Sequence, residues 1–297
     1  MNTLAKRIFS LKIAKQTAEA FLQEEGITSL PVDPFAIAES RDIVVEGKPE
    51  NTEGVSGMLL RHGNNFGIIY ATHIPSVGFQ RFSVSHELGH YFLPVHIDQV
   101  LQGGVHLSRA GFVTADPYGL EADHFAAGLL LPSAPFRKVI DAYDPGLEAI
   151  EAVADLCVTS RTATAIRFAE LTDSAVAVIM STGGNIDYCF MSDATKSLPK
   201  LDFLRKGTRL AAGTATARLA SDPACVRRGD RIADETDIRD WLSGFTKAAV
   251  SEESVGLGGY RKVLTILVSP TVGQDNEPDE DGEEDDLIES LTPRFHR

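Results

Sequence analysis

The sequence predicts an α+β protein with more than one domain. Strand-like and helix-like runs follow one another up to residue 140, and a second group of strand-like runs begins near residue 174. Only helical patterns lie between these groups. A chain of 297 residues is long enough for two or three such parts. We therefore expect parts at residues 1–140, 141–173 and 174–270, followed by an acidic segment at residues 271–297.

The first part is predicted to open with two helices and three strands. Residues 8–25 place apolar side chains at helical spacing and are followed by Gly26, a common helix terminator. Residues 62–65, His-Gly-Asn-Asn, form a hairpin signal between two strand-like runs. The expected elements are helices at 8–25 and 34–39 and strands at 43–46, 55–61 and 66–70.

The most informative motif is His86-Glu87-Leu-Gly-His90, within an apolar stretch that reads as a helix. Two histidines four positions apart lie on one helix face, so both imidazoles can reach one metal ion. Zinc is the usual metal for such a pair. Glu87 follows the first histidine and can take a proton from water beside the metal. The motif predicts metal-assisted hydrolysis, with His86 and His90 as ligands and Glu87 as general base.

A simpler interpretation is that these histidines are ordinary core residues, because a histidine on an apolar helix is more often a satisfied core residue than a ligand. The neighbouring Phe82, Val84 and Leu88 predict that this helix is buried. Three buried polar side chains without partners would be costly, whereas a metal ion removes that cost. The context therefore favours the metal site.

A catalytic zinc needs a third protein ligand and an open position. His96 would complete a metzincin-like spacing, but that pattern uses glycine at a sharp turn where this chain has Pro94. Glu121 lies on a helix predicted to end at Pro132, on the face expected to be buried. Asp123 is a third candidate ligand, although it fits better as a residue that positions the helix or another ligand. Glu121 is therefore the preferred third ligand.

Four segments share an order and spacing with a known family. They are Gly54-Val-Ser-Gly57-Met-Leu-Leu60, the strand-like residues 66–70, Gln80-Arg-Phe-Ser-Val-Ser-His86-Glu-Leu-Gly-His90-Tyr91, and Glu121-Ala-Asp-His-Phe-Ala-Ala-Gly-Leu-Leu-Leu-Pro132. Over about residues 10–140 the chain resembles the ImmA/IrrE family of intracellular zinc peptidases. One departure is Gly128, which stands where many relatives carry glutamate, and we expect it to matter little.

The resemblance implies a zincin-like metallopeptidase domain with one Zn²⁺ per chain. Its ligands would be His86, His90 and Glu121, and Glu87 would be the catalytic base. The expected substrate is a protein, a helix-turn-helix transcriptional repressor, whose cleavage derepresses stress or mobile-element genes. The strands at 55–61 and 66–70 are a candidate edge for binding an extended peptide, since an exposed edge can pair with one.

Residues 141–173 resemble a helix-turn-helix, with helices at 147–158 and 160–171. Only Arg161 and Arg167 mark its second helix, and phosphate binding needs more positive charge. We therefore expect a packed helical hairpin and no direct DNA binding.

Residues 174–270 are predicted to form a separate α+β domain. Strands are expected at 175–180, 186–191 and 263–268, with helical or irregular segments at 201–204, 211–219 and 236–245. Relatives of the radiation-resistance branch carry a GAF-like domain in this position, and this segment is similar to it. No ligand-binding motif can be named there.

Composition favours a cytoplasmic protein. The three cysteines, Cys157, Cys189 and Cys225, are scattered and form no metal-binding pattern, which indicates reduced thiols. No secretory signal and no apolar run of membrane-spanning length is found, so no membrane association is expected. The net charge is −14, and ten acidic residues without a basic one lie between Asp275 and Glu289. We expect this tail to be disordered.

Two functions compete at this stage. One is a peptidase that cleaves a repressor. The other is a non-catalytic regulatory or DNA-binding protein with a structural metal site. A three-ligand site beside Glu87 favours the enzyme, because structural zinc sites usually have four protein ligands.

Overall fold

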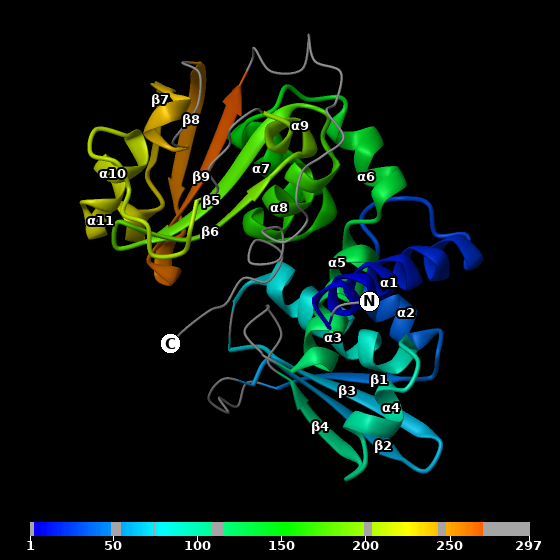
Figure 1. Ribbon diagram of the computed structural model, residues 1–297. Helices are drawn as coiled ribbons and strands as arrows, with labels where there is room; N and C mark the ends of the chain where they lie inside the picture. Colours follow the sequence, from blue (N-terminus) through cyan, green and yellow to red (C-terminus); the bar gives the residue numbers. More distant parts are fainter. Residues whose placement is uncertain are drawn as a thin grey trace. The chain divides into compact units, whose positions relative to one another are not determined.

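The structure, a computed structural model, describes residues 3–48, 55–73, 75–108, 116–198, 204–242 and 248–269. These residues form two compact units (Figure 1). The first comprises residues up to 138 together with 154–163, and the second comprises residues 139–153 and those from 164 onward. The helical segment expected at 141–173 is thus divided between the two units. The acidic segment expected at 275–289 lies outside the described residues.

The first unit combines a small sheet with helices. Its elements are α1 (Thr3–Glu24), α2 (Pro34–Glu39), β1 (Val44–Lys48), β2 (Gly57–His62), β3 (Asn65–Ala71), α3 (Val77–Phe92), α4 (His96–Val100), β4 (Val105–Ser108), α5 (Pro117–Leu130) and most of α6 (Ser133–Ile140). Asp33 caps α2 by accepting a hydrogen bond from the Phe35 amide, with Pro34 in the first turn. The sequence predictions for α1, α2, α3 and the first three strands are confirmed within a few residues, whereas α4 and β4 were not expected.

The four strands of this unit follow the order β1-β3-β2-β4. β1 runs parallel to β3, and the other neighbours are antiparallel. The hairpin between β2 and β3 turns at Gly63, whose φ of 62° suits glycine. β4 pairs with β2, so the expected peptide-binding edge on the β2–β3 pair is wrong. In the described part of the sheet, β4 and β1 are the edge strands.

The core of the first unit lies where α1, α3 and α5 meet the sheet. Leu59 and Ile68 from the sheet and Leu88 from α3 are fully buried there. α1 packs closely on α5 at Gly128, where an added Cβ would lie 2.6 Å from the Lys15 carbonyl oxygen. Gly128 therefore has a packing role. The expectation that this departure matters little for the metal site stays a prediction.

The second unit contains a five-stranded antiparallel sheet in the order β6-β5-β9-β8-β7. Its elements include β5 (Ala175–Thr182), β6 (Asn185–Met191), α9 (Asp193–Lys196), α10 (Ala215–Ala220), α11 (Pro223–Arg228), β7 (Arg231–Asp237), β8 (Ala249–Gly256) and β9 (Lys262–Ser269). α7 (Leu147–Cys157) and α8 (Arg161–Leu171) contribute residues to both units.

The sequence prediction missed two strands of this sheet, β7 and β8. No strand was expected at β7, and only its last two residues fall in the helical or irregular segment expected at 236–245; it is a largely exposed edge strand with a polar sequence. β8 carries Glu252 at a fully buried position, where a carboxylate is unusual. Its Oε1 accepts hydrogen bonds from the Thr216 amide (2.7 Å) and hydroxyl (2.6 Å), which explains how a polar run can occupy the sheet.

Candidate metal centre

α3 presents His86, Glu87 and His90 within the first unit. Ser76 caps this helix by accepting a hydrogen bond from the Phe79 amide. All three side chains are buried, each at most 1% exposed. The Nε2 atoms of His86 and His90 lie 3.2 Å apart. Two ligands at about 2.0–2.1 Å from one tetrahedral zinc would have a similar separation, so this pair fits a shared metal ion.

His86 is held from the far side of its ring by Asp123 of α5, whose Oδ1 lies 2.7 Å from His86 Nδ1. Burial lowers the pKa of His86, but the Asp123 carboxylate outweighs it, and the pKa is raised overall. A carboxylate that accepts the Nδ1 proton leaves Nε2 free to bind a metal. Asp123 thus occupies the positioning place that the sequence suggested for it.

His90 is held by a second chain of contacts. Its Nδ1 lies 3.2 Å from Nδ1 of His96, and Nε2 of His96 lies 2.9 Å from Glu121 Oε2. Burial, followed by the neighbouring histidines, lowers the pKa of His90 strongly. The hydrogen bond with His96 lowers the pKa of Glu121, so this group is an ionised acceptor at neutral pH.

The placement of His96 corrects one expectation. A sharp turn without glycine was thought unfavourable, yet the chain makes it with Val95 in the left-handed region at a φ of 73°. His96 begins α4 and is buried beside His90. Strained backbone of this kind clusters at functional sites.

Glu87 lies between α3 and β2. A Cβ on Gly57 would come within 2.5 Å of its Oε1. Neither carboxylate oxygen has a hydrogen-bond partner among the described residues, although the Ser108 hydroxyl is near enough to favour ionisation. Burial is the main cause that raises the pKa of Glu87 to about 7. A buried carboxylate near the His86 imidazole suits a proton acceptor for a bound water.

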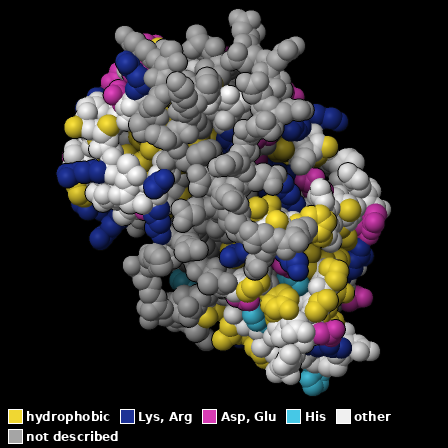
Figure 2. Space-filling view, in the orientation of Figure 1, with side chains coloured by type: hydrophobic (Ala, Val, Ile, Leu, Met, Phe, Trp, Pro, Cys, Tyr) yellow, Lys and Arg dark blue, Asp and Glu magenta, His cyan; other side chains and the backbone are white. Residues whose placement is uncertain are grey.

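His106 of β4 is a residue that sequence reasoning missed. Its ring centroid lies 4.6 Å from that of His90, in an edge-to-face arrangement. The only sequence signal was a histidine in a short run between Gly104 and Ser108, which became visible as a strand only through pairing with β2. Figure 2 shows histidine and hydrophobic side chains together on the surface of the first unit.

Within the described residues, no group of three or more His, Cys, Asp or Glu side chains is already arranged to hold a metal ion. His86 and His90 converge on one position, but the Glu121 contact in this centre is with His96. The assignment of Glu121 as third ligand therefore stays a prediction.

Residues 38–168 match the family model of the IrrE N-terminal-like domain, Peptidase M78. This segment is an IrrE N-terminal-like domain. The match contains α3, α5 and every residue of the candidate centre, so the domain is metallopeptidase-like. Its resemblance to the ImmA/IrrE peptidases, noted from the motifs, is confirmed.

A solved structure named as a Mycobacterium tuberculosis transcriptional regulator has a similar fold, with a TM-score of 0.54. The similarity covers 91% of this chain and 82% of that chain, at 12% sequence identity. At this identity the likeness concerns the fold alone. No match was found among curated proteins.

The IrrE N-terminal-like domain extends into α8, which carries the two arginines of the helix-turn-helix-like segment. Arg161 is exposed, but Arg167 is buried and donates a hydrogen bond of 2.8 Å to Glu170. Arg167 therefore cannot reach a phosphate group without leaving this ion pair.

No helix in the described part of the chain has both the length and the apolar character needed to cross a membrane.

Proposed function

We propose that this protein is a zinc-dependent endopeptidase of the His-Glu-x-x-His type that acts in the cytoplasm. Its substrate would be a helix-turn-helix transcriptional repressor, and its cleavage would derepress stress or mobile-element genes. The family match supports a peptidase, and the motif supports zinc. The observation that carries the proposal is the buried Glu87 carboxylate, which has no hydrogen-bond partner among the described residues and lies near enough to His86 for that imidazole to act on its pKa.

The residues of the centre divide the chemistry between them. His86 and His90 would hold the metal, and Asp123 keeps the free nitrogen of His86 directed at it. A zinc ion bound there would supply Lewis-acid activation of the scissile carbonyl and of a water molecule. Glu87 accepts the proton of the attacking water and delivers it to the leaving amine. The low polarity around Glu87 favours both transfers, because it keeps the pKa of the carboxyl near 7.

The substrate would lie along β4, an edge strand in the described sheet. An extended peptide can add to such an edge through backbone hydrogen bonds. Val105 and Leu107 are exposed on β4, whereas His106 between them faces His90. The strand ends at Ser108, which pairs with Gly57 beside Glu87. A peptide on β4 would therefore pass the predicted base.

The decisive variant is Glu87→Gln, which keeps the size of the side chain but cannot accept the proton. We expect it to bind zinc as the wild type does and to lose peptidase activity by at least about 10²-fold. Purified wild-type and variant protein, with and without zinc, would be incubated with candidate repressors, and cleavage followed by mass spectrometry. His62→Ala, an exposed histidine at the end of β2, is the matched control. Wild-type cleavage rates in Glu87→Gln would refute the assignment.

We also propose that the second unit is a GAF-like domain. Its five-stranded antiparallel sheet with short helices supports this. Such a unit could hold a small ligand or dock a partner, and its fold does not decide between these roles.

A second candidate is a regulator without catalysis, in which the metal is structural. The observation in its favour is that the structural neighbour is named as a transcriptional regulator. Under this alternative, zinc removal would abolish the fold or DNA binding, and Glu87→Gln would have no consequence. Duplex DNA binding measured at two salt concentrations separates the candidates, since phosphate contacts weaken as salt rises.

A further inference from the structure

We propose that a hollow on the second unit binds a small organic molecule with one anionic group, which Arg227 and Arg261 hold between them. The hollow has a volume of about 260 Å³. Its lining comes from α10, α11, the end of β5 and the start of β9, and consists of Thr182, Gly183, Ala220, Pro223, Val226, Arg227, Arg261 and Val263. No residue of the candidate metal centre belongs to it, so the two sites are separate.

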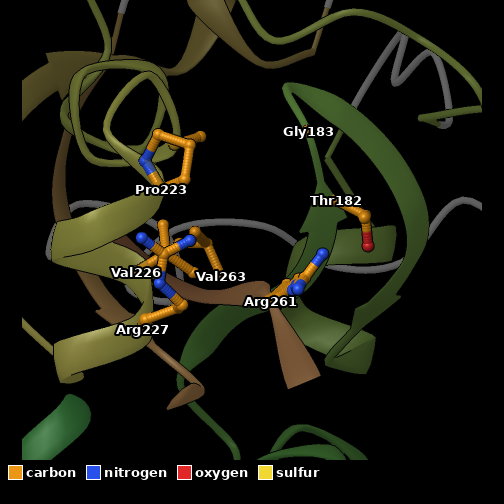
Figure 3. Close-up of a pocket in the computed structure, with 8 residues that line it drawn as sticks. Thr182, Gly183, Pro223, Val226, Arg227, Arg261 and Val263 are labelled. Atoms are coloured by element: carbon orange, nitrogen blue, oxygen red, sulfur yellow. The ribbon is translucent and has the colours of Figure 1, made fainter. Parts of the chain in front are cut away.

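The hollow is formed by segments that are far apart in the sequence. Figure 3 shows Pro223 and Val226 of α11 on one side, Thr182 and Gly183 on the other, and Arg261 between them. The three groups come from a helix, the end of a strand and the loop that precedes β9. The site therefore exists only in the folded unit, and no motif in the sequence announces it.

The two arginines of the hollow lack partners in the described part of the protein. Arg227 and Arg261 are both exposed, and neither side chain has a hydrogen bond or an ion pair with a described residue. Their sequence neighbours Arg228 and Lys262 are each paired with a carboxylate, at 2.6 Å and 2.5 Å. The positive charge of the hollow is thus not offset by an ion pair to any described residue.

The carboxylates beside the hollow are already engaged. Asp187 accepts hydrogen bonds from the Thr182 hydroxyl (2.8 Å) and from Lys262 (2.5 Å). Asp230 accepts two from Arg228, at 2.6 and 3.3 Å. Either arginine of the hollow would have to displace an existing partner to reach these carboxylates. An anion that comes from solution meets no such competition.

The backbone holds both arginines at the rim. α11 ends at Gly229, whose left-handed φ of 78° terminates the helix and leaves Arg227 in its last turn. Arg261 itself has a left-handed φ of 55°, which is uncommon for a residue other than glycine. Its exposed side chain has no contact with a described residue that offsets this cost. Such strain is found at ligand clamps, where it places a functional group.

The chemistry of the lining defines the ligand class. A guanidinium group has a planar fork of N–H donors and no acceptor, so two of them facing one hollow favour an anion. Carboxylate and phosphate oxygens accept from such a fork in pairs. Four lining side chains have no polar atom, namely Ala220, Pro223, Val226 and Val263. They suit the apolar body of an organic molecule, which a bare inorganic anion lacks.

The volume limits the size of this ligand. Sites for drug-sized molecules usually measure roughly 300–1,000 Å³, and the hollow is smaller. A single ring or a short chain with one anionic group fits this space. The anionic group is a carboxylate or a phosphate ester, because both accept from the same donors.

Phenyl phosphate and benzoate are the probes, and binding is measured by calorimetric titration of the full-length protein at constant ionic strength. Inorganic phosphate lacks the apolar body and benzyl alcohol lacks the charge, so both should bind at least about 10-fold more weakly than the preferred probe. Binding of phenyl phosphate alone assigns phosphate esters, and binding of benzoate alone assigns carboxylates. Equal binding of both assigns the anionic group without discrimination. Absence of binding by both probes would overturn the site.

Variants of the two arginines separate this site from any other place where an anion could bind. Arg227→Gln and Arg261→Gln should each weaken the preferred probe by at least about 10-fold, since each removes charge-assisted hydrogen bonds. Arg227→Lys keeps the charge but not the fork, so its affinity should lie between the two. The matched control is Lys6→Gln/Lys12→Gln, which removes two exposed charges from α1. Wild-type affinity in the Arg227→Gln/Arg261→Gln protein would refute the proposal.

Modification by phenylglyoxal, read by peptide mass spectrometry, locates the bound probe directly. A saturating probe should slow the modification of Arg227 and Arg261 and leave that of Arg61, an exposed residue of β2, unchanged. Equal protection of all three would show a non-specific effect. Binding without protection of the first two would place the probe elsewhere, and either result would overturn the assignment.

Discussion

Gly57 of β2 lies directly against Glu87 of α3, such that a Cβ at Gly57 would sit 2.5 Å from the Glu87 Oε1 atom. Real Cβ atoms do not approach an oxygen so closely, so the carboxylate occupies space that only glycine leaves open. Gly57 is part of the segment that first suggested the family resemblance. The structure supplies its physical reason, which is the position of the predicted base.

Gly57→Ala should therefore displace the Glu87 carboxylate while leaving His86 and His90 in place. A shift of about 1 Å in a catalytic group can cost about 10²-fold in rate, and we expect a loss of that order with zinc content unchanged. Metal analysis and a cleavage assay on the same preparation check this. Gly103→Ala is the control, because no atom lies within 4 Å of its added Cβ. Full activity in Gly57→Ala would show that Glu87 tolerates the methyl group.

Val95→Asn should stabilise the protein. Asparagine tolerates the left-handed region better than a β-branched residue, and relief of this strain is worth about 1 kcal/mol. The Val95 side chain is 59% exposed, so little packing is lost. Urea denaturation of both proteins measures the difference. A decrease in stability would mean that the valine side chain contributes more than its backbone costs.

Gly128→Ala should destabilise the first unit, although alanine is normally the better helix former. The new methyl group would meet the Lys15 carbonyl oxygen at 2.6 Å, and forcing α1 away from α5 costs about 1–3 kcal/mol. Lys15→Ala should not rescue the variant, because the obstructing atoms include the Lys15 backbone. Thermal melts of the two single variants and the double variant test both statements.

The three cysteines should differ in their reactivity with iodoacetamide. Burial raises the pKa of Cys157 and of Cys189 to about 12, so almost no thiolate forms at pH 8 and neither thiol should react in the native protein. Cys225 is partly exposed, but its hydrogen bond to Asp222 raises its pKa.

Asp222→Asn removes that negative charge and should lower the pKa of Cys225. A larger thiolate fraction then exists at any pH below the original pKa, so alkylation at pH 8 should become faster, and the difference should vanish at high pH. Peptide mass spectrometry over time measures this. An unchanged rate would show that Asp222 does not control the thiol.

The metal motif could be predicted because its chemistry is local. Helix geometry alone sets His86 and His90 on one face, with Glu87 on the adjoining side, and the hydrophobic residues around them indicate a buried helix. The partner of each histidine could not be predicted in the same way. Asp123 is 37 residues from His86, and Glu121 is 25 residues from His96, so both contacts depend on how α5 and α4 pack.

The strands also divide into those that could be predicted from the sequence and those that only tertiary contacts reveal. β5, β6 and β9 were predicted because they are short runs of mostly apolar residues, which is typical of buried strands. β8 was missed because Glu252 looks exposed in the sequence, whereas in the sheet its Oε1 accepts hydrogen bonds from the Thr216 amide and hydroxyl of α10. β4 was missed because four residues carry too little periodicity until β2 pairs with them.

The amino-acid sequence by itself determined the α+β class, the helix that carries the His-Glu-x-x-His motif and the identity of the candidate base, because these follow from residue spacing within single elements. Tertiary structure alone decided that His96 and His106 surround His90, that Glu121 contacts His96, and that Gly57 leaves room for Glu87. These relationships join residues from different helices and strands, and side-chain periodicity within one element carries no information about which neighbour it will meet.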